Sequence, residues 1–501
     1  MKARSFMILG TSSGVGKSFI TAAFCRLLSD WGYSVAPFKS QNMSNNSFVT
    51  LEGGEIGRAQ AVQAECARVE PSIHMNPILL KPSADNQSQV ILHGKAVGNY
   101  AARTYFEKRA EMEKSVRQSY EKLASEFEMI VIEGAGSPAE VNLKKYDLVN
   151  MKTAEMADAR CLLVADIDRG GVFASVIGTL DLLEPSERDR IDGILINKFR
   201  GDQSLFDDGV KFLEEKTGKK VWGVLPHTRD LWLDEEDSLS VPDKAPASDP
   251  NEVDIVVLLM PRLSNFTDFQ VLGYEPGVRI RYVSRLDQLG NPDLLILPGT
   301  KATCADLEYW QVRGLKKWID NYAVKGGRVL GICGGYQMLG KTIKDPLVFE
   351  SHLRETEGLG FFDMVTIFQP EKVLKRVEDK MELEIFGIKI SSVIDGYEIH
   401  MGTSEHGRKY KTFGNAGAVM ENGKILGTYY HGLFESADFR KKFLNALAAD
   451  CGKKRISGTP FSMREIKEQN YQKLSAWLSS SINLDLLADK WGISPKIQPV
   501  S

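Results

Sequence analysis

The first stretch of this sequence that could do chemistry is a glycine-rich loop, GTSSGVGKS, at residues 10–18. It follows an apolar run and leads straight into a helical pattern, which is the order that a phosphate-binding loop requires. The backbone N–H groups at Gly14 and Gly16 can surround phosphate oxygens. Lys17 adds positive charge, and the hydroxyl of Ser18 can bind Mg²⁺. The loop therefore predicts a site for ATP with Mg²⁺.

A nucleotide site of this kind also needs a carboxylate, because a bound metal offsets the charge of the phosphates. The run MIVIE ends at Glu133, and the carboxyl end of a strand is the edge where open α/β sheets bind ligands. We expect Glu133 to bind the metal together with Ser18, the alternative being a solvated glutamate at a turn. Asn197 ends another apolar run and could bind an adenine edge, although an ordinary polar strand terminus explains it nearly as well.

A second centre is indicated by RVLGICGGYQML at residues 328–339, where an apolar run ends at Cys333 and a helical pattern follows. A turn from strand to helix forces the cysteine side chain outward, and the helix N-terminus favours its thiolate. A cysteine nucleophile also needs a base, and His431 ends a later apolar run. The pair predicts nucleophilic catalysis. The alternative is a small buried cysteine and a core histidine.

The elements that must position these residues are short apolar strands alternating with longer helical patterns, as in parallel sheets with helices on both faces. One proline-rich segment, SVPDKAPASDPNE, interrupts this alternation. The sequence thus predicts an α/β fold with two parallel-sheet domains. We expect a first domain at 1–239, a linker at 240–252, a second domain at 253–450 and a helical tail at 451–501 with one or two surface helices.

The composition argues against several classes of protein. Lys plus Arg number 63 and Asp plus Glu number 66, for a formal charge of −3, so no strongly basic field favours nucleic acid or an anionic membrane. The apolar runs are far shorter than the roughly 20 residues that span a bilayer. The N-terminal run is too brief for a secretory signal, and we expect a cytoplasmic protein. The six cysteines form no CxxC pair, so they suggest neither a disulfide framework nor a zinc site.

Both centres resemble known families. The loop at 10–18 is similar to that of dethiobiotin synthetase and its relatives, which share its spacing. The surroundings of Cys333 and His431 resemble the class I, triad-type glutamine amidotransferases. That resemblance implies that Cys333 attacks the side-chain amide of glutamine and that ammonia leaves. It also implies oxyanion donors at the N–H groups of Gly299 and Gly334.

One position departs from the amidotransferase pattern. The third member of the triad is usually a Glu two residues after the His, and Leu433 stands there instead. His431 must then be oriented by a backbone group or by another acid. Glu435 is close in sequence, but the sequence does not assign it this role.

The combination resembles the cobyrinic and cobyric acid amidases of cobalamin synthesis. Six segments are similar to the cobyric acid synthase family in particular, at residues 37–47, 53–64, 76–90, 166–175, 261–269 and 395–404. This resemblance implies that ATP activates carboxylates of adenosylcobyrinic acid a,c-diamide as acyl phosphates. Ammonia from glutamine then converts the b, d, e and g groups to amides. The substrates would be glutamine and the corrinoid, and the oligomeric state is not indicated.

Two other functions remain open at this point. Cobyrinic acid a,c-diamide synthase would use the same two centres on the a and c carboxylates. A P-loop partition or scaffold ATPase would instead carry a degenerate second domain that only binds. Because ammonia must reach the acyl phosphate without escaping or becoming ammonium, the ligase hypothesis also predicts a shielded route between the domains.

Five further residues are candidates for substrate binding. Gln41, Asn42 and Asn46 could donate to substrate carboxylates or contact Mg²⁺, although a run so rich in Asn and Ser is also ordinary loop chemistry. Asp166 and Arg169 lie at a strand end near the presumed nucleotide edge. There Arg169 could pair with a phosphate or a substrate carboxylate, with a structural ion pair as the rival interpretation.

Overall fold

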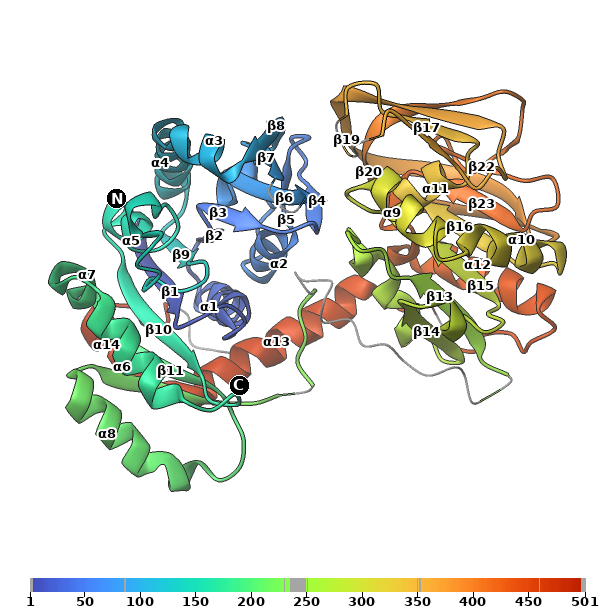
Figure 1. Cartoon of the computed structure of the whole chain (residues 1–501). Coiled ribbons are helices and arrows are strands. Elements are labelled where there is room, and N and C mark those ends of the chain that lie inside the picture. Colours follow the sequence, from blue (N-terminus) through green and yellow to red (C-terminus); the bar gives the residue numbers. More distant parts are fainter. Residues whose placement is uncertain are drawn as a thin grey trace.

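The computed structural model describes residues 3–84, 87–228, 230–234, 249, 251–348, 350, 353–458 and 460–496. Within them the chain forms two α/β bodies, and a long C-terminal helix extends from the first toward the second (Figure 1). The predicted α/β fold class is confirmed. Of the expected linker at 240–252, only 249, 251 and 252 are among the described residues. Over the described part of the chain, no helix is both long and apolar enough to cross a membrane.

The first body is built on a six-stranded parallel sheet. In spatial order its strands are β12 (Lys220–Pro226), β11 (Ile191–Phe199), β10 (Arg160–Asp166), β1 (Arg4–Gly10), β9 (Met129–Glu133) and β2 (Val35–Phe38). Because all six run parallel, their carboxyl ends share one edge. That edge carries the phosphate loop after β1 and Glu133 at the end of β9.

Alternate residues of β1 face the two sides of this sheet, as the two-residue period of a strand requires. Met7 and Leu9 pack into one core, whereas Phe6 and Ile8 pack into the other. The helices of this body are α1 (Lys17–Asp30), α2 (Arg58–Cys66), α3 (Ala102–Glu107), α4 (Arg109–Glu126), α5 (Met151–Ala157), α6 (Val172–Leu182), α7 (Pro185–Asp189) and α8 (Asp207–Thr217). Side chains of α4, α5, α6 and α8 join the first core, and those of α1 dominate the second.

Two small sheets that the sequence analysis did not predict lie between β2 and α4 in the chain. One has the order β3 (Gln41–Met43), β6 (Ile78–Ala84), β7 (Gln87–Leu92) and β8 (Lys95–Ala101). The other is a hairpin of β4 (Ser47–Val49) and β5 (Glu55–Gly57). Of these strands, β3, β4 and β5 have three residues each, too few to show an alternation in sequence. These sheets form the side of the first body that meets the second (Figure 1).

The second body has a seven-stranded sheet, parallel from β14 to β23. Its order is β14 (Val278–Val283), β13 (Val253–Leu258), β15 (Leu294–Leu297), β16 (Val329–Ile332), β23 (Ile425–Thr428), β22 (Gly417–Val419) and β21 (Lys411–Thr412). A second sheet has the order β18 (Glu355–Glu357), β17 (Thr342–Lys344), β19 (Met364–Ile385), β20 (Ile388–His406) and β24 (Tyr430–His431). The helices are α9 (Thr303–Gln311), α10 (Leu315–Val324), α11 (Gly334–Met338) and α12 (Ala437–Asp450). In this second sheet, β19 and β20 form a long antiparallel hairpin.

The C-terminal tail packs on the first body, although it follows the second in the chain. It forms α13 (Met463–Ser481) and α14 (Leu484–Trp491). Leu474 and Leu478 are fully buried in the same core as α1, and the Arg26 guanidinium binds the Glu468 carboxylate at 2.6 Å. Met463, at the start of α13, packs in the core of the second body instead. The tail therefore forms two helices, as predicted for this region, and connects the bodies by packing on both.

Candidate functional site

The phosphate loop connects β1 to α1 in a conformation that depends on two of its glycines. Gly14 has φ +73° and Gly16 has φ +99°, a region that side chains disfavour. A Cβ atom on Gly16 would also lie 2.3 Å from Nδ2 of Asn197. Lys17, the first residue of α1, donates from Nζ to the carbonyl oxygens of Ser12 and Gly136. The ammonium of Lys17 is thus held between the loop and the segment that follows β9.

Glu133 is the centre of a buried hydrogen-bond cluster beside this loop. Its Oε1 atom accepts from Oγ of Ser18 at 2.8 Å and from Nζ of Lys39 at 2.8 Å. Its Oε2 atom accepts from Nε2 of Gln63 at 2.5 Å. Lys39 follows β2, which lies next to β9, so three neighbouring strand ends bring these groups together. The sequence analysis did not identify Lys39 or Gln63.

The charges of this cluster suit a divalent cation. Burial alone would raise the pKa of Glu133, but the Lys39 ammonium and hydrogen bonds from Lys39, Gln63 and Ser18 lower it below its usual value. Glu133 is therefore an ionised carboxylate within 2.8 Å of a hydroxyl oxygen. Mg²⁺ prefers such oxygen ligands and commonly completes its shell with water and phosphate. Ser18 and Glu133 fit that donor set.

Two of the other residues expected near the nucleotide, Asn197 and Asp166, support the loop itself. Nδ2 of Asn197 donates to the carbonyl oxygen of Val15 at 2.8 Å. Asp166 accepts from Nζ of Lys198, which also donates to the carbonyl oxygen of Gly14. Asp166 thus takes part in an ion pair, the rival interpretation for this residue, and its partner holds the loop. Arg169 is exposed, and its guanidinium lies 3.8 Å from where a Cβ of Gly14 would be.

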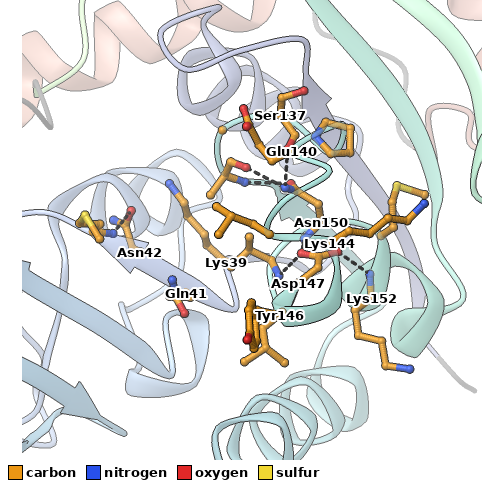
Figure 2. Close-up of a pocket in the computed structure, with 18 of the residues that line it drawn as sticks. Lys39, Gln41, Asn42, Ser137, Glu140, Lys144, Tyr146, Asp147, Asn150 and Lys152 are labelled. Carbon is orange, nitrogen blue, oxygen red and sulfur yellow. Dashed lines mark hydrogen bonds between the residues drawn. The ribbon is translucent and has the colours of Figure 1, made fainter. Parts of the chain in front are cut away.

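A cavity of about 1550 Å³ opens next to the loop (Figure 2). It is lined by Lys17, Ser18 and Glu133, and also by Lys39, Gln41 and Asn42. Ligand pockets commonly measure about 300–1,000 Å³, so this one has room for a nucleotide and a second, large substrate. Asn46 lies outside the described lining and is buried. The structure therefore brings two of the three predicted amide side chains to the cavity.

The second centre is formed at the carboxyl end of β16. Cys333 has φ +53° and ψ −110°, an unusual conformation for a residue other than glycine, at the turn into α11. The turn packs closely against the end of β15. A Cβ atom on Gly335 would lie only 1.9 Å from the carbonyl oxygen of Leu297. Sγ of Cys333 lies 3.4 Å from the carbonyl oxygen of Ile399. The predicted strand-to-helix turn therefore presents the thiol at the sheet edge.

His431 has an acidic partner that the sequence analysis did not find. Its Nδ1–H donates to Oδ2 of Asp268 at 2.6 Å, and Oδ1 of the same carboxylate accepts from N–H of Gly432. Leu433 is buried, as an apolar residue should be, and Glu435 lies 3.6 Å from Arg58 of the first body. Asp268 thus takes the role that the absent Glu would have had beside His431. Because Asp268 precedes His431 by 163 residues, no local sequence pattern connects the two.

The electrostatics of His431 favour its protonated form. Burial lowers the pKa of the imidazole, but the Asp268 carboxylate and the nearby Cys333 raise it to about 10. The ring is 1% exposed and stacks on Tyr397 with 5.2 Å between centroids. Nε2 of His431 has no hydrogen-bond partner among the described residues. That nitrogen is available to exchange a proton with a thiol or a leaving group.

The two predicted oxyanion donors lie beside this pair. A Cβ atom on Gly299 would be 3.3 Å from Cε1 of His431, so this backbone adjoins the imidazole. Gly334 is the first residue of α11, and the N–H groups of a first turn have no acceptor within the helix. The loops after β15 and β16 thus converge on one position next to Cys333. An anion formed there would meet backbone donors.

Two protein-family models match successive parts of the chain. Residues 6–241 match a family model described as the CobQ/CobB/MinD/ParA nucleotide binding domain. Residues 254–439 match the CobB/CobQ-like glutamine amidotransferase domain. The first match contains the phosphate loop and Glu133, and the second contains Asp268, Cys333 and His431.

Curated relatives match nearly the whole chain. Cobyric acid synthase of Carboxydothermus hydrogenoformans is 45% identical over 503 residues, covering 98% of this chain and 100% of that protein. Cobyric acid synthase of Listeria innocua is 46% identical over 495 residues, covering 96% and 95%. Cobyric acid synthase of Dehalococcoides mccartyi is 45% identical over 498 residues, covering 96% and 98%.

Proposed function

The chain belongs to the cobyric acid synthase family, and we propose how its two sites divide an ATP-driven, glutamine-dependent amidation between them. It is a ligase of cobalamin biosynthesis with a nucleotide-binding and a glutamine amidotransferase domain. What we propose is which residues act in each site, which residues hold the metal and which carboxylates are amidated. We propose that the substrate is adenosylcobyrinic acid a,c-diamide and that its b, d, e and g carboxylates become amides.

In the second body, Cys333 attacks the side-chain carbonyl carbon of glutamine. A C–S bond forms, the carbonyl oxygen becomes an oxyanion held by N–H of Gly299 and Gly334, and the C–N bond then breaks. His431 gives its Nε2 proton to the leaving ammonia. Asp268 keeps the other ring nitrogen protonated and stabilises the imidazolium. Water then releases glutamate and restores the thiol.

In the first body, a carboxylate oxygen of the corrinoid attacks the γ-phosphorus of ATP, and ADP leaves. The carboxylate must be activated because its oxygen is a poor leaving group until phosphate carries it away. Lys17 and Lys39 lie where they can stabilise negative charge on the transferred phosphoryl group. Mg²⁺ held by Ser18 and Glu133 would offset further phosphate charge.

Ammonia then completes the amide. Its nitrogen forms a bond to the acyl carbon, the bond from carbon to the phosphate oxygen breaks, and phosphate leaves with that electron pair and one proton of the ammonia. Water at this carbon would restore the acid and waste ATP, so the acyl phosphate must meet ammonia before water. The roles of Asn197 and Arg169 in nucleotide binding, and of Gln41 and Asn42 in corrinoid binding, stay predictions.

The observation that supports the proposal most strongly is the Cys333–His431–Asp268 arrangement in a chain whose other body holds a phosphate loop beside an ionised carboxylate. The test is mass spectrometry of the products formed from ATP, Mg²⁺, glutamine and the a,c-diamide. Four successive amidations are expected. A cobyrinic acid a,c-diamide synthase would leave this substrate unchanged, and a partition ATPase would release no glutamate.

A further inference from the structure

Two oppositely charged side chains are buried beside the glutaminase site and have no role in the mechanism proposed for it. Lys301 comes two residues after Gly299, and Glu350 lies between β17 and β18. Their side chains are 8% and 6% exposed, and Nζ of Lys301 lies 3.9 Å from Oε1 of Glu350. Buried charges are costly unless partners satisfy them, so this pair calls for a function.

The loop that carries Lys301 packs against the turn that carries the nucleophile. A Cβ atom on Gly334, the residue after Cys333, would lie 3.0 Å from Cγ2 of Thr300 and 3.1 Å from Oγ1 of Thr303. Lys301 stands between these two threonines in sequence, and the charge of Cys333 acts on its ammonium group. Lys301 is therefore held close to the reacting thiol.

Glu350 is fixed to the same loop. Its Oε2 atom accepts from N–H of Thr303 at 3.0 Å, and its own N–H donates to Oδ2 of Asp345 at 2.8 Å. Among the residues that the structure describes, the Lys301 ammonium has one ion-pair partner, and the 3.9 Å between the charged atoms is too long for a hydrogen bond. The two charges thus face each other without making direct contact.

Burial affects both groups more strongly than they affect each other. It lowers the pKa of Lys301, although the Glu350 carboxylate opposes this effect. It raises the pKa of Glu350, although the Lys301 ammonium and N–H of Thr303 oppose this effect. Each group is thus shifted toward its neutral form. A ligand that brings both a carboxylate and an ammonium group would supply each residue with the partner that it lacks.

We propose that Lys301 binds the α-carboxylate of glutamine, that Glu350 binds its α-ammonium group, and that the pair thereby selects a free amino acid for the Cys333 site. The inference deepens the proposed glutaminase function and rests on it. In glutamine, two methylene groups separate the amide carbon from the carbon that carries both charged groups. Residues that bind these groups must therefore lie close to Cys333, as the loop at 299–303 does.

Such selection serves the reaction as a whole. The proposed corrinoid products carry primary amides, and a thiol that attacked any primary amide would hydrolyse them again. An amide without an α-carboxylate and an α-ammonium group would leave Lys301 and Glu350 buried and unsatisfied. Sites that must pair buried polar groups with their substrate reject analogues lacking those groups much more strongly than apolar pockets do.

The test removes one charge from the protein and the matching group from the ligand. Lys301→Met should raise the KM of glutamine about tenfold or more, while kcat for glutamate release changes less than about threefold. The inhibition constant of 4-carbamoylbutanoate, which is glutamine without its ammonium group, should rise by a similar factor. That of 4-aminobutanamide, which lacks the carboxylate, should rise less than about threefold. Competitive inhibition of glutamine hydrolysis measures both constants.

Glu350→Gln should give the opposite pattern. The KM of glutamine and the inhibition constant of 4-aminobutanamide should rise about tenfold or more, because the ammonium group loses its partner. The inhibition constant of 4-carbamoylbutanoate should stay within about threefold. Lys341→Met is the matched control, because Lys341 is an exposed lysine of the same body that pairs with Asp363 at 2.7 Å. It should change none of these constants.

The crossed pattern separates a binding role from a structural one. Equal weakening of the two analogues in either variant overturns the proposal, since the pair then acts on the thiol or on the fold. Unchanged constants in both variants overturn it too, and leave the pair as a structural contact of the loop. If the wild-type chain releases no glutamate from glutamine, the proposed function itself has failed, and this inference fails with it.

Discussion

The two active sites of this chain differ in how they are assembled and in how they meet solvent. The synthetase site is built from neighbouring strand ends of one parallel sheet and opens to a cavity of about 1550 Å³. The glutaminase site joins three segments distant in sequence, and Cys333, Asp268 and His431 are 8%, 5% and 1% exposed. One site admits a large substrate, whereas the other encloses a small one.

This difference has a chemical reason. A phosphoryl group carries enough charge that positioning and electrostatics supply most of the catalysis, so Lys17 and Lys39, themselves buried, can act from the wall of a large cavity. A thiolate and an imidazolium must instead be held together away from water, which requires burial and a fixed acid such as Asp268. The sites should therefore fail independently when each is damaged, and the variants below test that expectation.

The largest effect is expected from Cys333→Ser. Glutamine-driven synthesis should fall about 10⁴-fold or more, because the nucleophile is lost, while synthesis from added ammonium stays within about threefold. Both rates can be measured by chromatography of the corrinoid products. Cys451→Ser, which replaces the residue directly after α12, is the control and should leave both rates unchanged. Retained glutaminase activity in Cys333→Ser would remove this thiol from the mechanism.

Asp268→Asn should reduce glutamine hydrolysis about 10³-fold, because the His431 imidazolium loses its counter-charge and its correct tautomer. The pKa of His431 is raised to about 10, so wild-type hydrolysis should persist in alkaline solution and decline as the pH rises through about 10. Without Asp268 this alkaline limit should move to lower pH. A pH profile of glutamate release measures both effects.

The matched control for this variant is Glu435→Gln, which removes the acid nearest to His431 in sequence. Glu435 pairs with Arg58 and is half-exposed, so its loss should change hydrolysis by less than about twofold. If Glu435→Gln has the large effect and Asp268→Asn the small one, the assignment of the third triad member is wrong.

Lys17→Ala should reduce synthesis about 10²–10³-fold with either nitrogen source, because the phosphoryl group loses its positive partner. Glutamine hydrolysis by the second body need not be lost. The measurement is amide formation from glutamine and from ammonium in parallel, with glutamate release as the internal control. Normal synthesis would exclude the loop at 10–18 from phosphoryl transfer.

Lys39→Met should have a smaller effect, about 10²-fold on synthesis from both sources. The variant also removes the main group that lowers the pKa of Glu133, so this pKa should rise. When the pH is lowered, Glu133 should therefore take up a proton, and activity should be lost, at a higher pH than in the wild type. A pH profile of ammonium-driven synthesis reveals this shift. An unchanged rate and profile would place Lys39 outside the reaction.

The smallest effect on activity is expected in the tail. Leu474→Ala removes a fully buried side chain from the core shared with α1 and should lower the free energy of unfolding of the first body by about 2–5 kcal/mol. Urea unfolding measures this change, and Lys473→Ala on the exposed face of α13 is the control. Equal stability of the two variants would contradict the docking of α13.

The sequence predicts those parts of the two sites whose residues belong to a continuous local pattern. The loop at 10–18 and its sheet edge are contiguous patterns, and Cys333 and His431 each end a recognisable strand. Asp268, Lys39 and Gln63 could not be predicted because each reaches its partner only through tertiary packing. The docking of α13 has the same explanation. The polar side of a surface helix looks the same in sequence whichever body its apolar side covers.

The central claim is that nitrogen released at Cys333 is consumed beside Glu133 within one molecule. It is tested most directly with glutamine labelled with ¹⁵N in its side-chain amide, supplied together with excess unlabelled ammonium. Mass spectrometry of the corrinoid product should find the new amides labelled, because ammonia passes between the sites without mixing with solvent. Amides with the isotope ratio of the bulk ammonium would contradict the account.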